Sequence, residues 1–196
     1  MRMWVNIGLA LALQLALLGY MIWDRISLLS DGREVELKVE PVDPRSLFRG
    51  DYVILTYAIS NLNTSALEGD DDFSRGDKIF VELILVGGTW QPVAIFHDKP
   101  STNSTIVIAG KVDRAYPAAT LVPPTDNTDE EPLTGTDLRI SYGVESYFVP
   151  EGEGRDLEKA RNADRMSVIL AVRDDGTAAI KKLMIDGQVF YEEGLL

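Results

Sequence analysis

The sequence predicts a mainly β protein, with an N-terminal transmembrane helix followed by an antiparallel β-sandwich or open-barrel domain that contains one short helix. Three observations support this prediction. A single uncharged apolar block runs from Met3 to Trp23. After it, strand-length apolar runs alternate with glycine and proline turn signals. Only one later segment, residues 151–164, has a helical pattern.

The apolar block is predicted to be an uncleaved membrane anchor. A helix over residues 3–23, after a short tail of residues 1–2, would extend about 31 Å, the thickness of one bilayer core. A cleaved signal peptide is the alternative, but it has a shorter apolar region and a small-residue cleavage site. The exit sequence GYMIWDRISLLS contains no Ala-x-Ala pattern. We therefore expect residues 3–23 to contact the lipid bilayer.

The rest of the chain, residues 24–196, is predicted to be a single extracytoplasmic β-rich domain at the cell (inner) membrane. The lysines and arginines that flank the anchor do not set its orientation, and a large C-terminal domain is often translocated whatever its charge. The formal net charge of −12 argues against nucleic acid as a partner, because phosphates would be repelled. The chain has no cysteine, which excludes disulfides and thiolate metal ligands.

The first two predicted strands flank a proline-containing turn. Residues 33–40 alternate apolar and charged side chains, which is typical of a half-buried strand. Pro41 and Pro44 end that strand, because proline has no N–H to donate. Residues 51–59, DYVILTYAI, are largely apolar on both faces, which predicts a central strand covered on both sides.

Three further strands and an insertion follow. Residues 60–77 are predicted to be a loop or short helical turn. The predicted strands are residues 78–86, residues 90–97 with Pro92 at the start, and residues 105–116. Residues 118–137 are rich in proline and acidic residues and have no sustained period, so we expect a surface insertion.

The C-terminal third combines strands with the single predicted helix of the soluble part. Residues 138–150 are expected to form one strand. In the helical segment, residues 151–164, Leu157, Ala160 and Ala163 are expected to face inward. Residues 166–193 end the chain as strands joined at Asp175-Gly176, with Asp186-Gly187 as a second turn.

Signals for catalysis or metal binding are weak. His97 is the one histidine that a Ser-His-Asp triad would have to use, and no Gly-x-Ser-x-Gly elbow occurs. The acidic stretches GDDDFSRGD and TDNTDEEP lack the ligand spacing of a known calcium loop, so solvated loops are favoured. We expect no cofactor and no metal.

The sequence contains two Arg-Gly-Asp tripeptides, a motif that suggests cell adhesion. Gly50-Asp51 and Gly76-Asp77 each come immediately before an apolar strand. Glycine permits a positive φ, and aspartate hydrogen-bonds the nearby backbone, so both are predicted to be strand-entry turns rather than adhesion signals.

An enzyme remains the alternative hypothesis. An anchor, a β-rich outer domain and a Gly-Asp turn loosely resemble type I signal peptidases, which use a Ser-Lys pair. Ser46 is the serine near the turn, and no lysine follows it in a comparable glycine-rich context. A membrane-anchored hydrolase or peptidase is thus the second choice, and a non-enzymatic role is favoured.

Two blocks of the sequence resemble one family, the GDYXXLXY proteins. The motif is intact as Gly50, Asp51, Tyr52, Leu55 and Tyr57, and the leader matches through Pro41, Asp43, Pro44, Arg45, Phe48 and Arg49. The second block matches through Tyr142, Gly143, Glu145, Tyr147, Phe148, Pro150, Glu151, Gly152, Gly154 and Glu158. The resemblance implies a bacterial, membrane-anchored protein associated with polytopic membrane proteins. It carries over no catalytic residue, since the family is functionally uncharacterised.

The charges in the two blocks suggest a site. Arginine forks match carboxylates bidentately, so Arg45 or Arg49 is expected to pair with Glu145 or Glu151 and to bring the blocks together. Either a structural ion-pair network or a polar groove for a peptide or partner loop would result. The candidate site residues are Asp43, Arg45, Arg49, Gly50, Asp51, Tyr52, Tyr57, Glu145, Tyr147, Glu151 and Arg155. The expected function is that of an accessory or binding subunit of an integral membrane protein.

Overall fold

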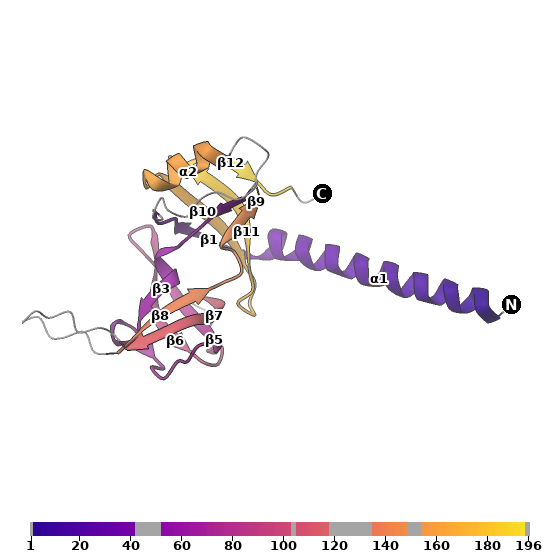
Figure 1. Cartoon of the computed structure of the whole chain (residues 1–196), viewed down its shortest axis with the longest axis horizontal. Coiled ribbons are helices and arrows are strands. Elements are labelled where there is room, and N and C mark those ends of the chain that lie inside the picture. Colours follow the sequence, from indigo (N-terminus) through magenta and orange to yellow (C-terminus); the bar gives the residue numbers. More distant parts are fainter. Residues whose placement is uncertain (1, 42–51, 103–104, 118–134, 149–153, 195–196) are drawn as a thin grey trace, which may run out of the picture.

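The computed structural model describes residues 2–41, 52–102, 105–117, 135–148 and 154–194, and it has a long N-terminal helix that projects from a β-rich body (Figure 1). The described helices are α1 (Arg2–Asp31) and α2 (Gly154–Asn162). The described strands are β1 (Arg33–Lys38), β2 (Tyr52–Ile54), β3 (Asn61–Asn63), β4 (Glu68–Gly69), β5 (Lys78–Val86), β6 (Thr89–Phe96), β7 (Ile106–Pro117), β8 (Thr136–Ser141), β9 (Ser146–Phe148), β10 (Met166–Val172), β11 (Ala178–Ile185) and β12 (Gln188–Glu192).

The described strands form three sheets. One has the order β1-β10-β11-β12, the largest has the order β3-β8-β7-β5-β6-β4, and the third contains β2 and β9. Every pairing is antiparallel except that of β4 with β6. The mainly β class with an apolar N-terminal helix is therefore confirmed, with one short parallel pair that the sequence did not predict.

Side chains from all three sheets meet in one hydrophobic core. Val35 and Leu37 of β1, Val81 and Leu83 of β5, and Leu170 of β10 are each at most 4% exposed. Burial of such a side chain stabilises the fold by about 1.5–3 kcal/mol. The alternation in residues 33–40 therefore indicates the core-facing residues of β1 correctly.

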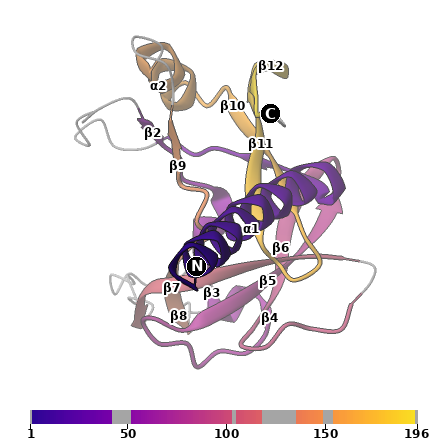
Figure 2. The ribbon, with the colours of Figure 1, turned by 90° about the vertical axis from the view of Figure 1, so that its right-hand side faces the viewer.

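Helix α1 continues beyond the predicted anchor and becomes part of the body. Its apolar segment is not buried against the rest of the chain. Leu28 and Leu29, in contrast, are 5% and 2% exposed and pack on Ala171 and Ala179. Figure 2 shows the helix crossing in front of β11, the strand that contains Ala179. The helix thus continues eight residues beyond the predicted anchor, to Asp31 rather than Trp23.

The predicted central strand at residues 51–59 is the main error. Strand β2 has three residues and pairs with β9 alone, and Ile54 on its outer face is 41% exposed. After β2 the chain turns within the predicted strand, in a 3₁₀ turn at Ala58–Ser60 where the Ser60 N–H donates to the Tyr57 carbonyl oxygen at 2.8 Å. Val53, Leu55, Tyr57 and Ile59 share one face and are all buried, so one of the two faces that were expected to be covered is covered.

Three other boundaries differ from the predictions. Residues 60–77 contain strands β3 and β4 as well as 3₁₀ turns. Residues 138–150 divide into β8 and β9, because Gly143 has a φ of +77° that interrupts extended backbone. Of the predicted insertion, residues 118–134 lie outside the described part, whereas Thr136 and Asp137 already belong to β8.

Two single-residue expectations are wrong. Pro92 lies within β6 rather than at its start, at a register shift opposite Glu82 and Leu83, and a bulge is where an inner strand tolerates proline. Ala163 is exposed, because α2 ends at Asn162 and Asp164 already has a φ of 58°. The turns at Asp175-Gly176 and Asp186-Gly187 are confirmed.

The β10–β11 turn generates a stability prediction. Gly176 and Gly187 both have positive φ, which disfavours any side chain by about 1–2 kcal/mol. Only at Gly176 would a Cβ also meet backbone, 2.9 Å from the Ala109 nitrogen, whose N–H donates to the Gly176 carbonyl oxygen. We expect Gly176→Ala to lower the urea midpoint of the full-length protein clearly more than the matched control Gly187→Ala. Equal midpoints would mean that the contact between the two large sheets at this turn contributes nothing.

Candidate functional site

The two sequence blocks singled out above lie against each other. Strands β2 and β9 pair antiparallel, with Val53 opposite Tyr147. Beyond the strand, the Leu55 N–H donates to the Glu145 carbonyl oxygen at 2.8 Å. The motif segment is therefore held on the second block by main-chain hydrogen bonds, and this junction is the base of the candidate site.

Two tyrosines fix the junction by reciprocal hydrogen bonds. The Tyr57 hydroxyl donates to the Val144 carbonyl oxygen, and the Tyr142 hydroxyl donates to the Ile59 carbonyl oxygen, both at 2.6 Å. Each block thus supplies one donor and one acceptor to the other. Both side chains are buried, with 0% and 7% exposed. Burial, and secondarily the charge of Glu145, raises the pKa of both phenols above the ordinary value, so the hydroxyls stay protonated as donors.

The Glu145 side chain has a local partner. Its carboxylate accepts the backbone N–H of Tyr142, which closes the turn between β8 and β9. The predicted ion pair of Glu145 or Glu151 with Arg45 or Arg49 stays a prediction, because both arginines and Glu151 lie outside the described residues.

Of the remaining predicted site residues, some lie outside the described part of the chain and others within it. Asp43, Gly50 and Asp51 also lie outside the described part of the chain. Tyr52 is described through its backbone in β2, and Arg155 through its backbone in the first turn of α2. The structure therefore brings together Tyr57, Glu145 and Tyr147 from the predicted set.

Sequence reasoning missed Arg161, which attaches α2 to the junction. This arginine is 3% exposed, and its Nη1 donates to the Ile54 carbonyl oxygen at 2.7 Å. Ile54 is the last residue of β2, so Arg161 binds the carbonyl oxygen at the point where this strand ends. The available signal was its position four residues after Leu157, since residues four apart share one face of a helix.

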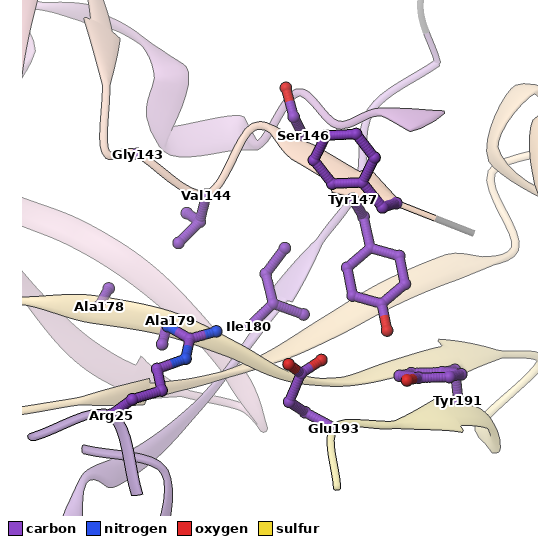
Figure 3. A pocket seen from close by; sticks show the side chains of 11 residues that line it. Arg25, Gly143, Val144, Ser146, Tyr147, Ala178, Ala179, Ile180, Tyr191 and Glu193 are labelled. Atoms are coloured by element: carbon purple, nitrogen blue, oxygen red, sulfur yellow. The ribbon is translucent and has the colours of Figure 1, made fainter. Parts of the chain in front are cut away.

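A cavity of about 360 Å³ opens beside this junction, between β9, the β11–β12 hairpin and the end of α1 (Figure 3). Its wall includes Tyr147, whose ring meets that of Tyr191 edge-on at 5.4 Å. Burial, followed by the neighbouring Tyr191 hydroxyl, raises the pKa of Tyr147 above its ordinary value. The size is within the range of small-molecule sites, which runs from about 300 to 1,000 Å³.

The cavity carries one positive and one negative side chain. Figure 3 shows the Arg25 guanidinium and the Glu193 carboxylate directed into the same space from α1 and from the end of β12. The apolar surface between them comes from Val144, Ala179 and Ile180. Such a site suits a ligand with both charges and a short apolar part.

Elsewhere, the residues considered for chemistry are engaged in local contacts. His97 lies 3.0 Å from Asp72 through Nε2 and stacks on Phe73, and this histidine lowers the pKa of Asp72 through their hydrogen bond. No group of three or more potential metal ligands occurs among the described residues. The lysines whose side chains are described are all exposed or half-buried, whereas a lysine base requires burial. Ser46 lies outside the described part of the chain.

The strand-entry role of the second Arg-Gly-Asp is confirmed. Gly76 has a φ of +98°, and the Asp77 carboxylate accepts the Ser74 N–H at 2.8 Å. The carboxylate thus binds the preceding backbone rather than the following one. Gly50-Asp51 lies outside the described residues, so its role stays a prediction.

The buried tyrosines generate a pH prediction. Their pKa is raised in the folded state, so the unfolded chain releases their protons first and stability is lost as pH rises above about 10. Each contributes a slope of up to about 1.4 kcal/mol per pH unit. We expect Tyr57→Phe and Tyr142→Phe to flatten the alkaline decline in unfolding free energy, whereas Tyr116→Phe, at a 54% exposed position, should not. A smaller phenolate absorbance near pH 10 in folded Tyr57→Phe or Tyr142→Phe than in the folded wild type would contradict this account, because it would mean that the buried phenols ionise with the exposed ones.

Comparison with known proteins agrees with the two-block resemblance. Neither the curated proteins nor the solved structures include a significant match to this chain. A protein-family model described as "GDYXXLXY protein" matches residues 14–183, which include the C-terminal part of α1, both halves of the β2–β9 junction, strand β10 and most of β11. With the motif intact and most of its length matched, the chain belongs to the GDYXXLXY family.

Proposed function

We propose that this protein is anchored in the cell (inner) membrane by α1, with its β-rich domain outside the cytoplasm, and that it is a non-enzymatic binding subunit of a polytopic membrane protein. The observation that carries the proposal is the helix. Residues Trp4–Asp31 have a mean hydropathy of 1.9 in their most apolar window, none of which is buried in the chain. A surface this apolar needs lipid or another protein around it.

The C-terminal end of α1 supports an anchor rather than a removable leader. Arg173 on the turn after β10 pairs with the Asp24 carboxylate and also donates to the Asp24 carbonyl oxygen, both at 2.9 Å. Leu28 and Leu29 complete the packing on Ala171 and Ala179. A cleavage near Trp23 would cut a continuous helix whose last two turns belong to the domain.

The exposed edge strand β12 supports a protein partner. It is the last strand of its sheet, so its outer backbone groups have no strand neighbour among the described residues. Three consecutive apolar side chains on it are exposed: Val189 at 51%, Phe190 at 42% and Tyr191 at 38%. Natural edge strands are usually charged or covered, so such an edge indicates contact with another molecule.

Purification of the tagged full-length protein from alkali-washed membranes tests the proposal. We expect the chain to stay in the membrane pellet with residues 1–23 present in its intact mass, and protease to reach the domain only from the outer side. Leu13→Asp with Leu17→Asp should release it, because each charge at a helix centre disfavours insertion by about 2.5–3.5 kcal/mol, whereas alanine at both positions should not.

The same preparation tests the partner. A polytopic protein should co-purify in fixed ratio with the wild type. The double variant Val189→Lys with Phe190→Lys should abolish this co-purification. Leu85→Lys with Val86→Lys is the matched control, since these are also neighbouring exposed apolar strand residues, at 57% and 47%. A cleaved chain, a cytoplasmic domain, or equal loss in both lysine pairs would overturn the proposal.

A further inference from the structure

The cavity beside the β2–β9 junction lies next to the part of α1 where the uncharged apolar block ends. Arg25 comes two residues after Trp23, the last residue of the uncharged block. If α1 spans the bilayer as proposed above, Arg25 is at the level of the lipid headgroups, where charged residues follow the apolar span. Figures 1 and 2 both place β9 and β11 on the side of the body from which α1 projects. The following inference therefore depends on the proposed anchor.

The two charged side chains that line the cavity have no partner among the described residues, whereas the charges next to them in sequence are paired. Asp24 and Glu192, the immediate neighbours in sequence, form ion pairs with Arg173 and Lys182 at 2.9 and 3.0 Å. Within the described residues, the Arg25 guanidinium and the Glu193 carboxylate form no hydrogen bond or ion pair. Two opposite charges that face one space without neutralising each other match a ligand that carries both signs.

The cavity also separates a place for an anion from a place for a cation. The Tyr147 and Tyr191 rings lie on the Glu193 side of the space (Figure 3). Aromatic faces attract a cation, and a carboxylate accepts hydrogen bonds from an ammonium group. Arg25, on the helix side, matches a phosphate through its guanidinium fork.

We propose that this cavity binds the headgroup of a zwitterionic phospholipid, phosphatidylethanolamine, from the leaflet next to the domain. Arg25 binds the phosphodiester, Glu193 accepts from the ammonium, and the tyrosine pair covers the ethylene link. The apolar wall at Ile180 is next to the glycerol end. An anionic headgroup without an amine would satisfy Arg25 and leave Glu193 facing a negative charge, so the site selects against phosphatidylglycerol.

The test uses the full-length protein in nanodiscs that contain equal amounts of phosphatidylethanolamine and phosphatidylglycerol. Native mass spectrometry after gentle detergent release counts the lipids that remain bound. We expect one retained phosphatidylethanolamine, enriched several-fold over the bilayer ratio. Arg25→Gln and Glu193→Gln should each reduce this enrichment to the bilayer ratio, because each removes one charge-assisted contact.

Two matched controls and one competitor separate the outcomes. Glu192→Gln, one residue along β12, and Arg114→Gln, an exposed arginine on β7, should keep the enrichment. Soluble glycerophosphoethanolamine should fail to displace the lipid, and displacement by it would overturn a lipid site in favour of a free phosphodiester site. Insertion into nanodiscs without selectivity would overturn the headgroup site and leave the anchor standing. Failure to insert would overturn the proposed anchor and this inference with it.

Discussion

The reciprocal hydrogen bonds of Tyr57 and Tyr142 are the interaction on which the rest of the architecture depends. Each hydroxyl donates to a main-chain carbonyl of the other block, across 87 and 83 residues of sequence. Buried carbonyls require a partner, and loss of one donor leaves such a group unsatisfied at a cost of about 1–3 kcal/mol. The two bonds also fix the register of β2 on β9, which is too short a pair to be stable alone.

From this junction the structure extends in two directions. Val39 and Tyr57 form a bridge that connects β1, and hence the sheet on which α1 packs, to the motif segment. On the other side, Arg161 attaches α2 to Ile54, and Tyr147 extends from the junction into the cavity. The family motif residues Leu55 and Tyr57 are thus structural in position, since 1% and 0% of their surface is exposed. The lining of the cavity is supplied by less distinctive residues, including Arg25, Glu193 and Tyr191.

Short sequence patterns predicted those parts of the fold that depend on residues close together in the chain. The β10–β11 and β11–β12 hairpins follow from Asp-Gly turns, and the shared face of Val53, Leu55, Tyr57 and Ile59 follows from the period of two. The shortness of β2, the parallel pair of β4 with β6, and the break between β8 and β9 depend on partners far along the chain, so no local pattern indicates them. For the same reason the sequence led to an arginine–carboxylate pairing for the two blocks, whereas the described contacts use main chain and tyrosine hydroxyls. The cavity was not predicted, because Arg25 and Glu193 come from opposite ends of the chain.

A double-mutant cycle at Tyr57 and Tyr142 measures whether their two hydrogen bonds hold one junction together. Tyr57→Phe and Tyr142→Phe each remove one hydroxyl without changing the ring, and urea unfolding of the full-length protein gives the loss in each single variant and in the pair. Because both bonds stabilise one junction, the account predicts that each single loss is about 1–3 kcal/mol and that the double loss departs from their sum by at least about 0.5 kcal/mol. Single losses no larger than that of the exposed control Tyr116→Phe would contradict it.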